Sequence, residues 1–259
     1  MFRTSMLVPT RERPHMLENF IQSVLLNTKF IENINIYFIC DDDDTLTQEH
    51  VEIIKKRTPQ VEIHLLCRPR SEMLNEDYYN FAARQADGDL LWILADDLII
   101  VQPNWDEHVD RVAQSAFNAW PDRVVCFSLR DNTPPPSHKI PKFPCFPMLT
   151  PQAMKSLGGW ILHPKVPTWG ADYVTYCIFE PIGRLIQLHD TNYLNHVSWH
   201  NKQVAVDHIN ERIGQIFNKL KMISHHNTDR IIAEECPAIR GHIKDYIKSL
   251  AEQVPGQDA

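Results

Sequence analysis

Two adjacent carboxylates interrupt an apolar run near the middle of the chain. The stretch WILADDLII, residues 92–100, opens like a buried strand, reaches Asp96 and Asp97, and resumes with three aliphatic residues. Because an unpaired charge in apolar surroundings is costly, we expect the pair either at a strand end in water or around a cation. Mg²⁺ and Mn²⁺ prefer oxygen ligands, so one carboxylate suits such an ion and the other a ligand hydroxyl. An ion held there would neutralise a diphosphate and make it a better leaving group.

A late pair of histidines offers ligands of another type. The segment NHVSWHNKQVAVD contains His196 and His200 and ends at Asp207. Imidazole nitrogen is a suitable additional ligand for Mn²⁺. The simpler interpretation of two histidines four residues apart is one helix face or a packed core histidine. As a zinc motif the pair is weak, because it has no cysteine partner and no H-E-x-x-H glutamate.

Strands and helices alternate over the first half of the chain. Apolar runs predict strands at residues 5–10, 34–40, 61–67, 90–94 and 123–129, and helical spacing predicts helices from Pro14 and over residues 49–57 and 75–86. This alternation implies right-handed crossovers and a mostly parallel sheet covered by helices on both faces. The fold class is therefore α/β.

Polar residues follow the first four predicted strands at the point where each strand ends. In open parallel sheets the functional site lies outside the carboxyl ends of the strands, so these residues should converge on one edge. A solvated loop charge is the alternative for any single residue, but it explains all four groups together less well. The groups are Thr10, Arg11 and Arg13, then Asp41 to Asp44, then Arg68 and Arg70, and last Asp96 and Asp97.

The composition is that of a soluble globular protein. Of the 259 residues 43% are hydrophobic and 23% charged, and the net charge of −7 does not favour nucleic-acid or anionic-membrane binding by the whole chain. The six cysteines are scattered without a C-x-x-C pair, so we expect reduced thiols and a cytoplasmic protein. No apolar stretch approaches the roughly 18 residues of a membrane span, so no integral membrane contact is expected.

Glycine is scarce, and its absence from the beginning of the chain excludes whole classes of nucleotide site. The chain has eight glycines, the first of them Gly88. Walker-A loops and dinucleotide fingerprints need glycines so that backbone amides approach phosphate. If the first 87 residues bind phosphate, side chains and a metal ion must do so.

The second half of the chain is less regular. The proline-rich stretch at residues 130–147 predicts an irregular loop, either a static excursion or a lid beside the site. Amphipathic patterns at residues 204–222 and 239–250 predict helices that pack on the core or form a dimer face, so the protein is expected to be a monomer or a homodimer. We expect a catalytic domain over residues 1–203 and a helical extension, residues 204–259, packed on it.

Seven short motifs in order resemble a glycosyltransferase of the GT-A fold, closest to the family-two type. Each motif is weak alone, but the ordered set covers roughly residues 5–207 and is fairly specific. The resemblance implies a Rossmann-like, mostly parallel sheet flanked by helices, with C-terminal helices. The motifs are VPTRERP at 8–14, CDDDD at 40–44, Asn80 before Gly88, GDLLWILADD at 88–97, LGGW at 157–160, WGAD at 169–172 and the late His196.

The resemblance implies a nucleotide pocket at the first sheet edge. Pro9, Thr10 and Arg11 would line it, and Asp41 would bond the base or ribose. Asn80 matches a family asparagine near the nucleotide.

The same resemblance implies roles at the reacting centre. Asp97 matches the last aspartate of the D-x-D motif, which ligates the metal, and Asp96 would lie beside the ribose and sugar. His196 would complete the metal shell. Asp172 matches the carboxylate that deprotonates the acceptor hydroxyl, with Glu180 and Asp190 as rivals.

Two positions depart from the family pattern. Ala95 stands where the first aspartate of D-x-D usually lies, which weakens the metal assignment. Tyr79 stands where the family commonly has arginine.

The implied reaction is a single in-line displacement that moves a sugar from a nucleotide-diphosphate sugar, with a UDP-sugar as the expected donor, to a hydroxyl acceptor. It would use Mn²⁺ or Mg²⁺ and invert the anomeric carbon, although the sequence leaves a retaining reaction open. The acceptor is open between a glycan, a protein, a small molecule and a modified DNA base. Four basic residues of the proline-rich stretch would suit a polyanionic acceptor: Arg130, His138, Lys139 and Lys142.

Three other functions compete with this one. The first is a non-catalytic nucleotide-sugar binding module, which would have no need of a base at Asp172. The second is a nucleotidyltransferase with a related fold, although its triphosphate loop needs glycines that VPTRERP lacks. The third is a zinc hydrolase that uses His196 and His200.

Overall fold

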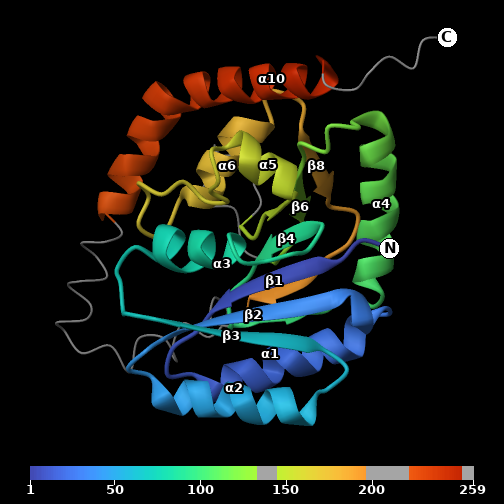
Figure 1. Cartoon of the computed structure of the whole chain (residues 1–259), viewed down its shortest axis with the longest axis vertical. Helices are drawn as coiled ribbons and strands as arrows, with labels where there is room; N and C mark the ends of the chain where they lie inside the picture. Colours follow the sequence, from blue (N-terminus) through green and yellow to red (C-terminus); the bar gives the residue numbers. More distant parts are fainter. Residues whose placement is uncertain (133–144, 197–221, 253–259) are drawn as a thin grey trace.

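A seven-stranded sheet runs through the centre of the protein (Figure 1). The computed structural model describes residues 1–132, 145–196 and 222–252. The strand order is β3-β2-β1-β4-β7-β6-β8, and all neighbours are parallel except that β7 runs antiparallel to β4 and β6. The strands are β1 (Thr4–Pro9), β2 (Ile34–Asp41), β3 (Glu62–Arg68), β4 (Leu90–Ile93), β6 (Cys126–Leu129), β7 (Met148–Leu149) and β8 (Leu185–Leu188).

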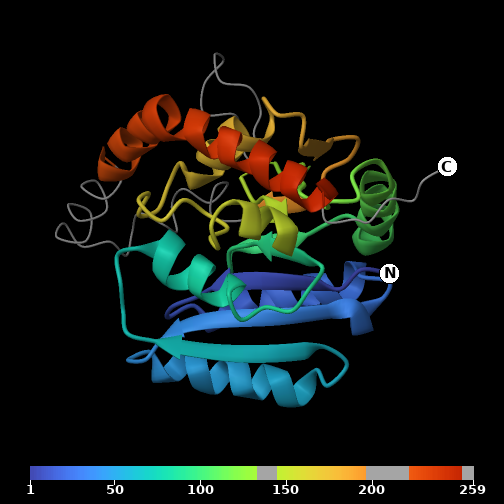
Figure 2. The same ribbon diagram turned by 45° about the horizontal axis from the view of Figure 1, so that its top comes forward.

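Helices cover both faces of this sheet, as the alternation of strands and helices predicts (Figures 1 and 2). One face packs on α1 (Pro14–Asn27), α2 (Thr45–Arg57) and α4 (Trp105–Ala119). The other face packs on α3 (Phe81–Ala83), α5 (Pro151–Ser156), α6 (Ala171–Phe179) and α10 (Cys236–Glu252). Because side chains alternate along a strand, Met6 points into the first core and Leu7 into the second.

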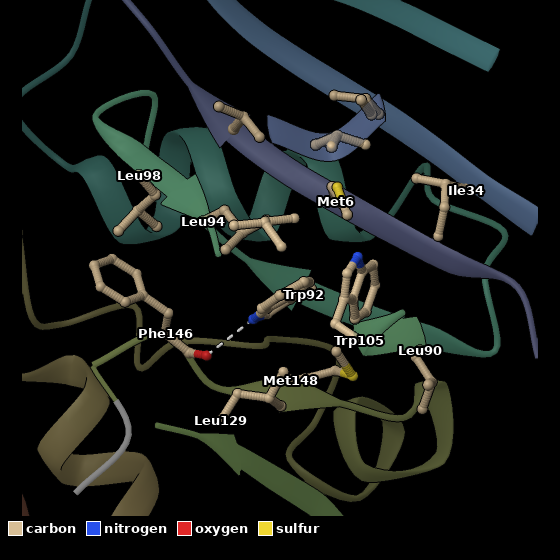
Figure 3. Packing of buried hydrophobic residues seen from close by; sticks show 14 of the residues in the cluster. Met6, Ile34, Leu90, Trp92, Leu94, Leu98, Trp105, Leu129, Phe146 and Met148 are labelled. Atoms are coloured by element: carbon tan, nitrogen blue, oxygen red, sulfur yellow. Dashed lines mark hydrogen bonds between the residues drawn. The ribbon is translucent and has the colours of Figure 1, made fainter. Parts of the chain in front are cut away.

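Trp92 lies at the centre of the first core. Its ring is fully buried, and its centroid lies 4.7 Å from that of Trp105 on α4. Figure 3 shows the indole between Met6 and Met148, with its N–H donated to the carbonyl of Phe146 at 3.2 Å. A buried indole N–H needs such a partner. The bond ties β4 to the chain that enters β7.

The parallel pairing continues to the carboxyl ends of the first four strands. Thr10 donates its backbone N–H to Ile39 at 3.0 Å, and Leu94 donates to Leu7 at 3.0 Å. Asp42 donates in the same way to Arg68 at 2.8 Å. The prediction that these four strand ends meet at one sheet edge is confirmed.

The structure differs from the sequence prediction in the connections. Residues 75–86 do not form one α-helix, because a π-helix, η2 (Leu74–Asn80), precedes the short α3. The fifth predicted strand begins at Cys126, since Arg123 has a positive φ of 55° and lies in a turn. The two-residue β7 was not predicted. It follows the proline-rich stretch and enters between β4 and β6.

A separate two-stranded ribbon lies beside the main sheet. Its strands are β5 (Leu98–Ile100) and β9 (Leu194–His196), which pair antiparallel with Leu98 opposite His196. On its other side β9 contacts the chain after β6: Tyr193 donates to Arg130 at 2.8 Å and Asn132 donates to Leu194 at 3.1 Å. The ribbon therefore connects WILADDLII to a segment about a hundred residues later.

The C-terminal helix packs on the second core. The predicted apolar positions of α10, among them Ile239, Ile243 and Ile247, contact that core, and Arg240 donates to the carbonyl of Cys177 on α6 at 2.9 Å. The short η3 (Ile231–Glu235) precedes it. The predicted boundary at residue 203 and most of the predicted helix at 204–222 lie outside the described residues, so both stay predictions. Among the described residues, no helix has the length and apolar character needed to span a bilayer.

The cysteines differ in burial. Cys40, Cys126 and Cys236 are buried free thiols that pack as small apolar groups. Cys67 on the edge strand β3 is exposed instead.

Two glycine substitutions test the fold in opposite directions. A Cβ on Gly88 would lie 2.5 Å from Ser5 Oγ and 2.8 Å from Ser5 N, so Gly88→Ala must separate β1 from the start of β4. We expect it to lower the free energy of unfolding by about 1–3 kcal/mol. Gly241 in α10 has open space around it, so Gly241→Ala should raise stability by about 0.5–1 kcal/mol. Urea unfolding measures both, and a neutral Gly88→Ala would contradict the close approach.

Candidate active site

The two aspartates of WILADDLII occupy the middle of a tight turn between β4 and β5. Leu98 donates its N–H to the carbonyl of Ala95 at 3.3 Å, which closes the turn around Asp96 and Asp97. Ala95, which departs from the family pattern, packs against the first core. The turn therefore projects two carboxylates, and not three, at the sheet edge.

Asp96 is a buried carboxylate with two partners from the connection between β1 and α1. Its Oδ2 accepts from Thr10 Oγ1 at 2.9 Å, and its Oδ1 lies 2.7 Å from Arg13 Nη2. Burial raises the pKa of Asp96 to about 6, against the opposing effect of Arg13 and with a further increase from Asp97. A sugar hydroxyl would have to compete with these two partners, so the predicted contact to ribose or sugar stays a prediction.

Asp97 and His196 come together across the β5–β9 ribbon. Asp97 Oδ2 lies 3.2 Å from His196 Nε2, because Leu98 pairs with His196 in the antiparallel register. The backbone N–H of His196 donates to Asn132 Oδ1 at 2.8 Å, and its ring meets Phe146 edge-on at 5.6 Å. One carboxylate oxygen and one imidazole nitrogen form a donor set that suits Mn²⁺. Within residues 1–132, 145–196 and 222–252, no three His, Cys, Asp or Glu side chains form a metal cluster.

A second group of charges lies at the ends of β1 and β2. Arg11 Nη1 lies 2.7 Å from Asp41 Oδ2 and 2.5 Å from Asp43 Oδ1. Asp43, with Asp41 and Glu12, raises the pKa of Arg11, and Arg11 lowers that of Asp43. The other oxygen of the buried Asp41 accepts a hydrogen bond from Tyr78 Oη.

The remaining residues expected at the nucleotide pocket differ in exposure. Pro9 ends β1, and Thr10 is buried with its hydroxyl donated to Asp96. Arg11 keeps about a quarter of its side chain exposed, so a ligand can reach it more directly than the buried Thr10. From the third strand end, Arg68 lies 4.8 Å over the ring of Tyr78.

Two tyrosines of the π-helix η2 reach the strand ends of the site. In η2, Tyr78, Tyr79 and Asn80 are all buried. Tyr78 reaches Asp41, and Tyr79 Oη donates to the carbonyl of Leu94 at 2.8 Å. π-Helical turns often occur at functional sites.

Asn80 and Asn75 connect η2 to the loop that precedes α6. Asn80 Oδ1 accepts the backbone N–H groups of Ile161 at 2.8 Å and Leu162 at 3.0 Å, while its Nδ2 donates to Leu162 O and Glu76. Asn75 Nδ2 donates to the carbonyls of residues 166 and 168 at 2.7 and 2.8 Å. The amide of Asn80 is fully used inside the protein, so its expected contact with the nucleotide stays a prediction.

Asp172 lies in the first turn of α6 and is partly buried. Its Oδ1 accepts the N–H of Tyr173 at 2.9 Å. Burial raises the pKa of Asp172 to about 7, and the negative charge of Asp131 adds to this effect. Burial also raises the pKa of Tyr79, which the charges of Asp96, Asp97 and Asp172 raise further, so all three carboxylates lie near this tyrosine.

The rivals of Asp172 lie elsewhere. Glu180 follows the last residue of α6, about 12 Å along the helix from Asp172 at 1.5 Å per residue, and it is exposed. Asp190 is more than half exposed and lies 3.4 Å from Tyr193 Oη and 3.9 Å from His108.

The conformation of Gly170 fixes the start of α6. It has a φ of 91°, and a Cβ there would lie 2.4 Å from Thr228 Oγ1 on the helix at 222–230. Only glycine adopts this conformation without strain. The helix at 222–230 is thus in close contact with the turn that precedes Asp172.

Several residues of this site have no role that the sequence predicts. Arg13 is only a loop charge in the sequence and Tyr79 only a departure from the family pattern, and Asn75, Tyr78 and Asp131 carry no motif. All of them are polar residues beside a strand end or inside a predicted helix. Their partners are distant in sequence, so local patterns do not reveal these contacts. Of the basic residues proposed for a polyanionic acceptor, Arg130 is exposed, and His138, Lys139 and Lys142 lie outside the described residues, as do His200 and Asp207.

Comparison with known proteins identifies the family. The model of glycosyl transferase family 2 matches residues 5–168, so the chain belongs to this family and is a glycosyltransferase. A search of curated protein sequences finds no significant match.

Solved structures show the same GT-A fold. The mannosyltransferase PcManGT from Pyrobaculum calidifontis, in complex with GDP-Man and Mn²⁺, is 15% identical, with a TM-score of 0.56 over 98% of this chain and 76% of that one. S. aureus TarS in complex with UDP is 11% identical, with a TM-score of 0.56 over 90% and 72%. GalNAc-T7 with UDP, GalNAc and Mn²⁺ is 16% identical, with a TM-score of 0.55 over 76% and 44%.

Removing the charge of Asp172 should stabilise the protein at neutral and alkaline pH. With a folded pKa of about 7 against the ordinary value of 3.8, the folded state binds more protons between these values, so stability falls as pH rises through this window. Asp172→Asn removes this loss. We expect it to match the wild type near pH 4 and to exceed it by on the order of 1–3 kcal/mol at pH 8.

Urea unfolding at both pH values measures the difference. Glu180→Gln is the matched control, because it removes an exposed charge at the other end of α6 and should change stability little at either pH. Equal stability of Asp172→Asn and the wild type at pH 8 would contradict a desolvated carboxylate at this position.

Proposed function

We propose that this glycosyltransferase moves a sugar from a nucleotide-diphosphate sugar to a hydroxyl acceptor with the help of a divalent metal ion. The observation that carries the proposal is the meeting of Asp97 and His196, 3.2 Å apart, at the sheet edge that also holds Asp41. A nucleoside diphosphate needs a metal ion at its phosphates and a polar group at its base or ribose. The Asp97–His196 pair suits the first need, and Asp41 at the end of β2 suits the second.

The donor is proposed to be a UDP-sugar, with Mn²⁺ or Mg²⁺ as the ion. Two of the structural neighbours are described with UDP and one with GDP-Man, and two of those complexes contain Mn²⁺. Arg11 and Asp41 are proposed to face the nucleotide. Asn80 is proposed to act through the backbone of Ile161 and Leu162, since its amide is engaged there.

Asp97 and His196 are proposed to hold the ion. An ion with these two protein ligands has positions left for diphosphate oxygens and water. When bound, it would neutralise the diphosphate and favour its departure. Thr10 and Arg13 keep Asp96 beside this pair, so the charges of the turn are already ordered before a donor arrives.

Asp172 is proposed to be the general base. A carboxylate with a pKa of about 7 accepts a proton more readily than an ordinary aspartate and still ionises near neutral pH. It would take the proton of the acceptor hydroxyl as that oxygen attacks the anomeric carbon. Attack on the face opposite to the leaving diphosphate inverts the stereocentre.

A donor panel tests the binding part of this proposal. Thermal unfolding is recorded with UDP-, GDP-, CMP- and dTDP-sugars, each with and without Mn²⁺, because a ligand that binds the folded state raises stability by mass action. We expect a shift with UDP-sugars that Mn²⁺ enlarges, and we expect Asp97→Asn to abolish the enlargement. If no donor shifts the transition under either condition, the nucleotide-sugar proposal fails.

Turnover of Asp172→Asn tests the catalytic part. General-base catalysis contributes on the order of 10²–10⁴ in rate, so the variant should bind the donor like the wild type and lose at least about a hundredfold in transfer. In the wild type, kcat/KM should fall as pH drops below about 7, where Asp172 becomes protonated. Glu180→Gln serves again as the control, and near-normal transfer by Asp172→Asn would remove it as the base.

A further inference from the structure

Arg13 contacts the two aspartates of the β4–β5 turn and has no part in the function proposed above beyond holding Asp96. Its Nη2 lies 2.7 Å from Asp96 Oδ1, and its Nη1 lies 3.9 Å from Asp97 Oδ2. That second oxygen is also the one that faces His196. One guanidinium therefore spans the two buried carboxylates of the turn, of which Asp97 is proposed to bind the ion.

The backbone on either side of Arg13 is held in place. Glu12 has a φ of 53°, and its N–H donates to Asp44 Oδ2 at 2.7 Å and to Thr47 Oγ1 at 3.0 Å. Pro14 follows as the first residue of α1, with its φ restricted by its ring. Arg13 thus starts from a fixed point, although 44% of its side chain is exposed.

The helix does not account for a cation at this position. Arg13 is the N-cap residue of α1, and the first turn of this helix contains no acidic residue. The positive end of the helix dipole lies there, so a cation at the N-cap is electrostatically unfavourable. The attraction that keeps the guanidinium here must come from the aspartates.

The charges define what Arg13 does to a metal ion. The two carboxylates carry −2 and Arg13 carries +1, so the set presents a net charge of −1. A divalent ion on Asp97 would meet a guanidinium already near the same oxygen, and the two cations repel each other. A diphosphate adds negative charge that both cations can share.

We propose that Arg13 is the resident cation of the Asp96–Asp97 pair and makes metal binding depend on the donor. It weakens binding of the divalent ion alone and contributes, with the ion, to binding of the diphosphate. The inference rests on the proposed metal-assisted function, because it concerns the affinity of that same site for the metal ion. In this scheme Arg13 acts on the ion by charge repulsion and on the diphosphate by charge attraction.

Direct measurement of Mn²⁺ binding tests the inference without any turnover. Free Mn²⁺ is followed by electron paramagnetic resonance with the full chain, in the absence and presence of UDP. For the wild type we expect weak binding that UDP strengthens. For Arg13→Gln we expect Mn²⁺ binding without UDP to be roughly tenfold tighter, because a nearby positive charge is gone, and a smaller effect of UDP.

The controls separate a specific from a general charge effect. Lys56→Gln removes one exposed positive charge on α2 and should bind Mn²⁺ like the wild type. If Arg13→Gln does not fold, because it leaves Asp96 buried without its partner, Asp96→Asn is compared with Asp96→Asn/Arg13→Gln. The double variant should bind Mn²⁺ more tightly than the single one.

Two results would overturn the inference. One is Mn²⁺ binding that is equal or weaker when Arg13 is replaced, which would leave Arg13 a purely structural partner of Asp96. The other is no Mn²⁺ binding by any form of the protein, with or without UDP. In that case a thermal shift with UDP-sugars alone still decides separately whether the chain uses a nucleotide-sugar.

Discussion

The buried negative charge of Asp96 is the constraint on which the candidate site depends. Its side chain is fully buried, and a carboxylate in such surroundings needs hydrogen-bond and charge partners. Thr10 and Arg13 supply them from the connection between β1 and α1. This short connection therefore contacts the turn that follows β4. Its middle residue, Glu12, bonds Asp44 after β2. Asp96 and Asp44 thereby hold this connection at the ends of β4 and β2.

The same edge is joined to the candidate base by η2. Asn75 and Asn80 bond the backbone at residues 161–168, shortly before the glycine that starts α6. Tyr79, between them in the sequence, bonds the strand end that carries the aspartates. One helix thus bonds both the strand end that precedes the aspartates and the loop that leads to Asp172, and such rigid support favours the preorganisation that catalysis requires.

Local patterns were enough to predict the parallel half of the sheet and the edge where its polar residues gather. Strand runs such as residues 34–40 are read from neighbours in sequence, and parallel connection follows from the helices between them. The partner of Asp97 depends on a register between segments 99 residues apart. The late histidine pair indicated an imidazole ligand, and the family resemblance selected His196 from it. The π-helix and β7 were missed because each is set by tertiary contacts that no local periodicity records. Arg13 was visible as a charge, but its target was not.

The β5–β9 ribbon restricts how this protein can change in length over evolution. Side chains alternate along a strand, so a shift of one residue in the pairing of Leu98 with His196 would bring Asn195 to the place of the imidazole. A one-residue insertion between β8 and β9 that shifted this pairing would therefore exchange the proposed nitrogen ligand for an amide, and it would also displace Leu194 from the first core. Loops elsewhere on the surface tolerate changes in length, but the segment before β9 must keep the length that preserves the register between β5 and β9.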